Sequence, residues 1–318
     1  LEMFKSMHAD IPQATLNNWM HKVMGRLREA LQGAMLEEVR KSAYVQNDET
    51  RIDVRSVIDG KEKYYTEYIH GCVSTERKIV VMLYEEGSRS AGVQLRNIFE
   101  GSSINAFTGD RAAIYGTIES CLVEYGVIRS ACWFHGRHYL VDAYISDKRM
   151  GPLIEMTNTL FRIERECADK PVWLRLQYRQ KYSLPIVDAI LRRLKAIRGD
   201  TSYGTLAQRA ARYILDDEQA FRMFLTDGRI MMHNNTAERM FRHIAMGRRN
   251  WLHSGSHDGA RNIAFMYSLL ESCKLNDLDF GDYIEDVMTR LAEGDTDHAS
   301  MIACNYKPRQ AEAIAKTA

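Results

Sequence analysis

The sequence predicts an α/β fold in which a mixed β-sheet is flanked by helices and interrupted by an all-helical insertion. Three observations lead to this fold class. Three strand-like stretches follow one another before residue 85, and strands and helices then alternate up to residue 133. From residue 135 to residue 225 no convincing strand pattern occurs. Sequential strands followed by alternating units are typical of a mixed sheet with helices on its faces.

The composition is that of an ordinary globular protein. The 318 residues suffice for about two domains, or for one domain with a large insertion. Hydrophobic residues make up 45% and charged residues 27% of the chain, which is usual for soluble proteins. The net charge is only +1, so any affinity for nucleic acid has to come from local clusters of basic residues.

The cysteines and the hydropathy pattern favour a cytoplasmic protein. Six cysteines are scattered without a C-x-x-C pair, which is typical of reduced thiols. The sequence shows no apolar run near the roughly 20 residues that a membrane span needs, and no charged-then-apolar leader. Because the chain enters a helical pattern almost at once, we expect that an upstream part is missing.

The first element is a helix from residue 11 to beyond residue 30, because apolar residues recur there at steps of three and four. These residues are Leu16, Trp19, Met20, Val23, Met24, Leu27 and Leu31. A packing helix is the preferred interpretation. The alternative is the last helix of a DNA-reading helix-turn-helix, whose partner helix is not visible in the sequence.

Strands are expected where β-branched and aromatic residues concentrate. Tyr44, Gln46 and Asp48 share one face of the first, loosely alternating strand. Residues 79–84 form a continuous apolar run, as expected of a strand covered on both faces. The expected order is strand 43–54, strand 63–72, strand 79–84, helix 90–99, strand 104–108, helix 112–124 and strand 127–133.

Helical periodicity dominates the rest of the chain. The expected helices cover residues 153–163, 186–197, 205–215, 218–225, 260–274 and 282–291, together with a helix that carries Glu238. Ser183 is expected to cap the helix that follows it, and Asn234 or Asn235 to cap the helix of Glu238. The polar residues after 292 are expected to form a loose tail.

Three carboxylates are candidates for a metal site. Asp48 lies within a predicted strand and Asp110 just after a later one, where a carboxylate usually needs a partner or a metal. If neighbouring strands bring these two together, a divalent cation relieves their repulsion, and Glu238 can supply a third ligand. Three carboxylates from strand, strand and helix are the pattern of two-metal phosphoryl transfer. Each aspartate taken alone is more often a turn or edge residue.

The densest basic and aromatic cluster follows Glu238. It comprises Arg239, Arg242, Arg248 and Arg249 with His243 and Trp251. Arginines on phosphate give sequence-independent affinity, and a tryptophan can stack on an unpaired base. The alternatives are a solvated helix face for the arginines and core packing for the tryptophan.

Cys132, His135 and His138 form a second motif that could bind a metal, in this case zinc. Only these three ligands are close together in the sequence, and no fourth is evident. A buried cysteine and a hydrogen-bonded histidine are therefore the preferred interpretation.

Several motifs occur in an order that resembles the transposases of the insertion-sequence 66 family, from about Pro12 to Leu291. The most specific part includes Asn234-Asn-Thr-Ala-Glu-Arg239, Gly247-Arg-Arg-Asn-Trp251, Gly255-Ser256 and Tyr267-Ser-Leu-Leu-Glu-Ser-Cys-Lys-Leu-Asn276. Upstream, the expected order continues with Asn47-Asp-Glu-Thr50, Gly109-Asp110 with the nearby Tyr115, and Cys132-Trp-Phe-His135.

The resemblance implies an RNase H-like core of the DDE type, with the helical insertion placed before the helix of the glutamate. Carried over by position, the catalytic and metal-binding triad is Asp48, Asp110 and Glu238, with Mg²⁺ or Mn²⁺. The implied reaction is nicking at the ends of an insertion sequence, followed by attack of the 3′ hydroxyl on target DNA. The implied partners are double-stranded DNA, further copies of the chain on that DNA and small accessory proteins of the same element. The implied location is the bacterial cytosol, at the nucleoid.

The chain is accordingly divided into segments of different expected role. These are an N-terminal helical segment (1–40), two parts of the RNase H-like core (41–135 and 229–292), the helical insertion between them (136–228) and a C-terminal tail (293–318). The N-terminal DNA-binding and zinc-binding region of the family is expected to be absent.

Two departures from the family pattern stand beside the triad. His233 replaces a usual Asp, and Gln46-Asn47 replace a usual His-Ala. Neither change removes a triad member, although each can alter the surroundings of the site. Two other functions stay open: a catalytically inactive DNA-binding remnant, and a related metal nuclease that cuts strands without joining them.

Overall fold

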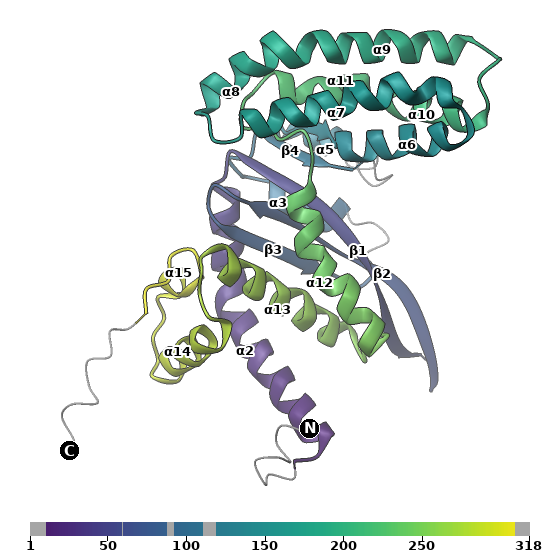
Figure 1. Ribbon diagram of the computed structural model, residues 1–318. Helices are drawn as coiled ribbons and strands as arrows, with labels where there is room; N and C mark the ends of the chain where they lie inside the picture. The colour runs from purple at the N-terminus through teal and green to yellow at the C-terminus, as the bar shows by residue number, and fades with distance from the viewer. Residues whose placement is uncertain (1–10, 59, 88–91, 111–118, 309–318) are drawn as a thin grey trace. The chain divides into compact units, whose positions relative to one another are not determined.

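The computed structural model describes residues 11–58, 60–87, 92–110 and 119–308 (Figure 1). Its five-stranded sheet has the order β3-β2-β1-β4-β5. The strands are β1 (Tyr44–Ile58), β2 (Lys61–Ser74), β3 (Ile79–Tyr84), β4 (Ala106–Gly109) and β5 (Ile128–Ala131). β3 pairs antiparallel with β2, whereas β4 is parallel to β1 and β5 is parallel to β4. The predicted mixed sheet flanked by helices is confirmed, in an arrangement consistent with an RNase H-like fold.

Two strands are longer than their sequence pattern predicts. β1 continues to Ile58 and β2 already begins at Lys61. The first residues of β2 are exposed, so this part of the hairpin carries no alternating apolar pattern that would reveal it. β3 coincides with its predicted range because all six of its residues are buried.

Contacts divide the chain into two compact units. The first unit comprises residues 1–42, 49–103 and 239–318, and the second comprises residues 43–48 and 104–238. Strand β1 and helix α12 (Asn235–Trp251) each begin in the second unit and continue in the first. Each unit therefore combines segments that are far apart in the sequence.

The second unit holds most of the helices that were predicted as an insertion. Residues 136–228, all of which the structure describes, contain no strand, as predicted. The helices, drawn in teal and green in Figure 1, are α6 (Trp133–Ser146), η1 (Lys148–Met150), α7 (Gly151–Glu166), α8 (Val172–Tyr178), η2 (Arg179–Ser183), α9 (Leu184–Gly199), α10 (Thr205–Leu215), α11 (Glu218–Arg222) and η3 (Met223–Leu225). The short α5 (Glu119–Glu124) lies between β4 and β5 in the sequence. One hydrophobic cluster runs from Tyr44 and Ala106 of the strands to Leu194 and Phe221 of the helices.

A π-helical turn, η2, joins α8 to α9 without a break. Ser183 has helical dihedrals, with φ −85° and ψ −38°, and its side chain makes no capping hydrogen bond. The prediction of a cap at Ser183 was wrong, because the chain is already helical before Pro185 and leaves no free helix start there.

The π-helical turn contains Arg179, whose side chain is fully buried. Its guanidinium donates to both carboxylate oxygens of Glu164 at 2.8 and 2.7 Å, a bidentate pair. It also donates to the carbonyl oxygens of Phe224, Asp227 and Ile230. These bonds anchor the segment that leads from the helical block toward α12.

The first unit contains α2 (Gln13–Arg40), α3 (Gly92–Phe99), most of α12, α13 (His257–Leu275), α14 (Phe280–Ala292) and α15 (His298–Met301). Helix α2 packs against β3, α13 and α15. Its buried residues include Met24, Leu27 and Leu31, whereas Trp19 and Met20 near its beginning are exposed. These contacts favour the packing helix over the helix-turn-helix interpretation.

Helix α13 covers the outer strand of the sheet. The hydroxyls of Ser272 and Ser268 accept hydrogen bonds from the backbone N–H groups of Val80 and Met82, at 2.9 and 2.8 Å. An outer strand otherwise exposes unpaired N–H groups. The two serines therefore protect an edge that could pair with another chain.

The segment that follows α14, up to residue 308, is partly buried and packs against α14. Met301, Ile302 and Ala303 are buried, and the hydroxyl of Tyr283 donates to the carbonyl oxygen of Met301 at 2.8 Å. The prediction of a loose tail was wrong for this segment, because three apolar residues among polar ones give no periodic pattern.

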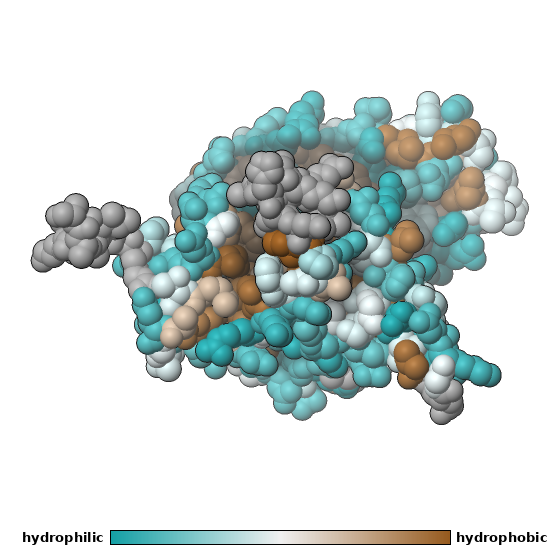
Figure 2. Space-filling view, turned by 90° about the horizontal axis from the view of Figure 1, so that it is seen from below, coloured by the Kyte–Doolittle hydropathy of each residue, from teal (hydrophilic) through white to brown (hydrophobic). Residues whose placement is uncertain are grey.

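The face shown in Figure 2 is mainly hydrophilic, with hydrophobic residues in small separate groups. Within the described ranges, no helix has the length and apolar character needed to cross a membrane.

Candidate functional site

The first two candidate carboxylates lie just beyond the paired part of two adjacent parallel strands. Gln46 of β1 pairs with Thr108 of β4, and Asp48 and Asp110 each lie two residues further along. Parallel strands advance together at a spacing of about 4.8 Å. Asp48 still belongs to β1, whereas Asp110 directly follows Gly109, the last residue of β4, and both aspartates are half-buried.

One face of these strands is covered by residues that precede α12. The hydroxyl of Tyr44 donates to Thr108 Oγ1 at 2.7 Å, and the hydroxyl of Thr108 donates to the carbonyl oxygen of Met231 at 2.8 Å. Alternate residues of a strand share a face. Asp48, which is in the same strand as Tyr44, therefore falls on the face of Tyr44 and Thr108, and Met231 of the segment before α12 contacts this face.

The start of α12 is fastened to β1. Gln46 is buried, and its Oε1 accepts hydrogen bonds from the backbone N–H groups of Thr236 and Ala237, at 3.0 and 3.4 Å. The side-chain amide of Asn234 donates to the carbonyl oxygen of Asn47 at 3.1 Å. The first turn of α12, which contains Glu238, is therefore fixed relative to the strand that carries Asp48.

The predicted asparagine cap of α12 was wrong. Asn234 and Asn235 have buried Oδ1 atoms without a hydrogen-bond partner in the described part of the chain. The free N–H groups of the first helical turn need acceptors. Gln46 of strand β1 supplies one acceptor, its Oε1. His233 Nδ1 supplies another, since it accepts from the N–H of Asn235 at 3.4 Å.

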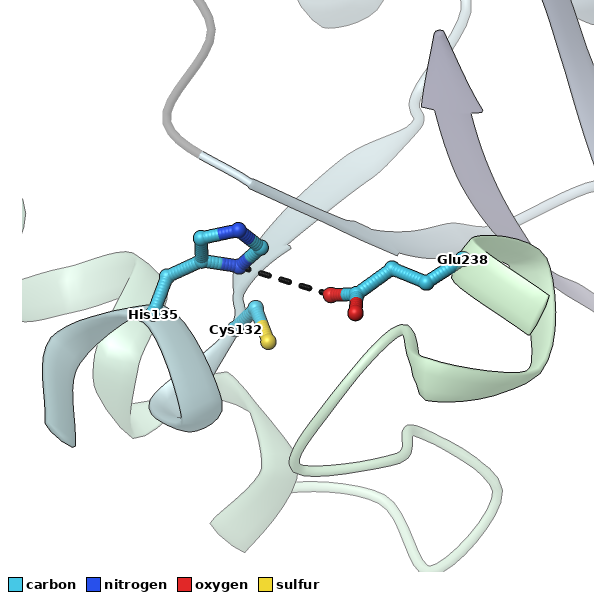
Figure 3. Close-up of side chains that lie close together, drawn as sticks. All are labelled: Cys132, His135 and Glu238. Carbon is cyan, nitrogen blue, oxygen red and sulfur yellow. Dashed lines mark ion pairs between the residues drawn. The ribbon is translucent and has the colours of Figure 1, made fainter. Parts of the chain in front are cut away.

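Glu238 lies next to Cys132 and His135 (Figure 3). One ligand atom from each of the three side chains lies within 4.8 Å of the other two. His135 Nδ1 and Glu238 Oε1 are 3.6 Å apart. Cys132 directly precedes α6, and His135 lies in the first turn of that helix. Cys132 and His135, for which a structural role was the preferred interpretation, thus lie together with a residue of the predicted triad.

The third member of the Cys-x-x-His-x-x-His motif lies apart from this group. The side chain of His138 is 69% exposed and lies 3.7 Å from Asp142 on the same helix. The spacing of Cys132 and His135 at a helix start was the usable signal. The residue that joins them comes from a position more than one hundred residues later in the chain, which no local spacing reveals.

The electrostatics of the group depend on burial. Burial raises the pKa of the Cys132 thiol to about 12, while backbone N–H groups of Asn234, His135 and Phe134 act in the opposite direction. The thiol is therefore protonated at neutral pH when no cation is bound. Glu238 Oε1 and His135 Nδ1 are buried atoms without a hydrogen-bond partner among the residues described.

A match along most of the chain decides the family. Residues 1–262 match the family described as Transposase IS66 family. The chain belongs to the IS66 family of transposases. The resemblance predicted from the motifs is confirmed.

Similar proteins occur in Sinorhizobium fredii strain NGR234, where they are named only as uncharacterized proteins. Protein y4qI is 28% identical over 313 residues, which are 94% of this chain and 57% of y4qI. Protein y4hP is 36% identical over 140 residues, which are 44% of this chain and 25% of y4hP. The chain therefore spans only part of the length of these relatives.

Both departures of the chain from the family pattern contact the start of α12, one from strand β1 and one from the segment just before the helix. Gln46 accepts the N–H groups of Thr236 and Ala237. His233 accepts the N–H of Asn235 and stacks on Phe161, with ring centroids 6.3 Å apart. The two residues therefore act together on the orientation of the helix that carries Glu238. Tyr115, the other residue of the upstream motifs that was singled out, lies outside the described residues.

The basic residues of α12 differ in their surroundings. Arg239, Arg242 and Arg249 are exposed on α12. Arg248 is half-buried and donates to Thr50 Oγ1 at 3.2 Å and to the carbonyl oxygen of Arg51 at 2.7 Å. The first three are therefore available to a phosphate backbone, whereas Arg248 holds α12 to β1 within the first unit.

Trp251, at the end of α12, is half-buried and borders a cavity of about 420 Å³ in the first unit. Met20, Met24 and Met266 also line this cavity. This environment agrees with partial core packing of the indole and leaves one edge open to the cavity.

Proposed function

We propose that this chain is the catalytic core of a DDE transposase, which cleaves DNA and joins the exposed 3′ hydroxyl to target DNA in the presence of Mg²⁺ or Mn²⁺. One observation carries the proposal. Asp48 and Asp110 each follow by two residues the paired residues Gln46 and Thr108 of adjacent parallel strands, and Gln46 also accepts hydrogen bonds from the start of the helix that carries Glu238. Family membership supports the same conclusion.

Asp48, Asp110 and Glu238 would hold the metal ions. Carboxylate oxygens are the ligands that Mg²⁺ prefers, and Glu238 Oε1 lacks a hydrogen-bond partner among the described residues. Bound ions would supply Lewis acidity at the attacking and leaving oxygens. The contribution of the chain itself is positional, because the bonds from Gln46 and Asn234 limit the freedom of the helix start that carries Glu238.

Arg239, Arg242 and Arg249 would bind DNA phosphates through their exposed guanidinium groups. Phosphate contacts position a duplex without reading its sequence. Recognition of element ends would require further parts of the protein or accessory proteins. Joining two ends would also require at least two copies of the chain on the DNA.

The test compares Asp48→Asn, Asp110→Asn and Glu238→Gln with the unchanged chain, using DNA that carries element ends and Mg²⁺. Nicking and joining are scored separately. We expect each variant to lose at least about 100-fold in both reactions, with bulk DNA binding retained. The matched control is Asp53→Asn. Asp53 is an exposed residue of β1, the strand of Asp48, and its Oδ1 accepts only from Thr66 among the described residues. This variant should keep the activity of the unchanged chain.

Other outcomes would identify the alternative functions. Nicking without joining by the unchanged chain would indicate a metal nuclease. DNA binding without either reaction would indicate an inactive remnant. Full activity of any one of the three variants would remove that residue from the triad.

A further inference from the structure

Glu238 belongs to a second group of potential metal ligands. We propose that Cys132, His135 and Glu238 form a binding site for Zn²⁺, and that an ion bound there withdraws Glu238 from the Mg²⁺ site and inhibits the enzyme. The binding site stands on its own geometry. The inhibition rests on the proposed transposase function.

The geometry of the three side chains is close to that of a zinc site. Tetrahedral zinc with bonds of about 2.0 to 2.3 Å places neighbouring ligand atoms about 3.3 to 3.6 Å apart. His135 Nδ1 and Glu238 Oε1 are already 3.6 Å apart, and no pair of the three donor atoms exceeds 4.8 Å. The side chains point toward one another in Figure 3. Small side-chain rotations therefore suffice to close the site.

Two of the ligand atoms are buried without hydrogen bonds. His135 Nδ1 and Glu238 Oε1 have no such partner in the described part of the chain, and a buried polar atom without a partner costs free energy. A cation between them would satisfy both atoms. The site has a third donor in Cys132, which is only 1% exposed and precedes the first turn of α6. Because the buried thiol is protonated when no cation is bound, Zn²⁺ binding would release its proton.

The donor set selects the kind of metal. Mg²⁺ and Ca²⁺ prefer oxygen ligands, whereas Zn²⁺ accepts sulfur, nitrogen and oxygen together. Three protein ligands leave a fourth position for water. Cys132 and His135 therefore distinguish this group from the all-carboxylate set of Asp48, Asp110 and Glu238.

The shared glutamate connects the two sites. If Glu238 Oε1 binds Zn²⁺, the carboxylate is held toward α6 by Cys132 and His135. The Mg²⁺ site then loses the ligand that the helix supplies. Micromolar Zn²⁺ is expected to inhibit cleavage even in excess Mg²⁺, because thiolate and imidazole bind zinc far more tightly than magnesium.

The binding site is tested with Co²⁺ as a spectroscopic substitute for zinc, using the whole 318-residue chain. We expect a thiolate-to-cobalt charge-transfer band that saturates at one equivalent and disappears when Zn²⁺ is added. Cys132→Ser should abolish the band, and His135→Ala should weaken Zn²⁺ binding at least about 10-fold. The matched controls are His138→Ala, on the same helix, and Cys121→Ser, a more accessible thiol; both should behave like the unchanged chain. Circular dichroism checks that each variant is folded.

A band that persists in folded Cys132→Ser, or the lack of any band in the unchanged chain, would overturn the zinc site. This result does not depend on DNA cleavage, so it remains decisive if the chain proves inactive. The inhibition has its own test, in which Zn²⁺ should suppress Mg²⁺-dependent nicking by the unchanged chain and by His138→Ala, but not by Cys132→Ser. Equal inhibition of all three proteins would contradict the role of the site in regulation.

Discussion

His70 is a buried histidine whose surroundings oppose protonation. Burial lowers the pKa of His70 to about 3. Its Nδ1 lies 3.3 Å from a carboxylate oxygen of Glu49, whereas its buried Nε2 has no hydrogen-bond partner among the described residues. A proton on Nε2 would therefore create an unpaired N–H. The neutral ring fits this site better than the charged ring, in spite of the nearby carboxylate.

This environment predicts a pH dependence of stability. Below the unfolded pKa of about 6.5, the unfolded chain binds a proton that the folded chain does not, so the free energy of unfolding should fall as pH falls. The slope approaches about 1.4 kcal/mol per pH unit for one such group. Urea denaturation of the unchanged chain and of His70→Gln between pH 7 and pH 5, where carboxylates stay ionised, should show a smaller slope for the variant. Equal slopes would mean that His70 is protonated in the folded state.

Gln46 and His233 show what the sequence could and could not predict at single residues. Both residues were recognised from the sequence as departures beside the proposed triad. The residues with which they form hydrogen bonds were not predicted. Gln46 accepts the N–H groups of Thr236 and Ala237, which lie 190 and 191 positions later in the chain. A helix cap supplied by a distant strand leaves no local sequence signal, whereas an asparagine cap would have left one.

Helix α12 combines two kinds of arginine within one element. Arg248 donates to Thr50 and Arg51 of β1, and Arg249 is exposed. The helical periodicity placed both in one basic cluster, because it reports which residues share a face and not which side chains find acceptors. Their substitution should therefore have different effects.

Arg249→Ala should weaken DNA binding without changing the free energy of unfolding. The slope of log affinity against log salt concentration should decrease by about the contribution of one phosphate contact. Arg248→Ala should lower the free energy of unfolding by about 1 kcal/mol, the usual value of a hydrogen bond of this kind. Salt titrations of DNA affinity and urea denaturation of both variants give the two readouts. The interpretation would be wrong if Arg248→Ala changed the salt dependence alone, or if Arg249→Ala destabilised the fold.

At the scale of the whole molecule, burial explains which elements were predictable. β3 is buried along its whole length and was predicted at its observed limits. The exposed start of β2 and the π-helical turn before Pro185 were missed, because neither carries a regular period. The pairing of β1 with β4, on which the proposed neighbourhood of Asp48 and Asp110 rests, could only be hypothesised, since it depends on contacts across about sixty residues of chain.

The composition of the second unit predicts how its fragments behave. Residues 44–46 of β1 pair with residues 106–108 of β4, and Tyr44 belongs to the hydrophobic cluster of this unit. A fragment of residues 104–238 would expose the edge of β4 and uncover part of that cluster. Exposed strand edges promote association, so we expect this fragment to form aggregates or dimers.

Supplying the missing strand should reverse this behaviour. In a second fragment, residues 43–48 are joined to residue 104 by a flexible linker of about a dozen residues, the length that a parallel connection needs. We expect this fragment to be a monomer with a higher free energy of unfolding than the fragment without residues 43–48. Size-exclusion chromatography with light scattering and urea denaturation compare the two fragments. The same fusion with Tyr44→Ala, which loses the ring and its 2.7 Å hydrogen bond to Thr108, is the matched control and should recover less. The prediction would be wrong if the fragment without residues 43–48 were as monomeric and as stable as the fusion. The strand would then not be an integral part of this unit, and the pairing proposed to orient Asp48 would not hold it in place.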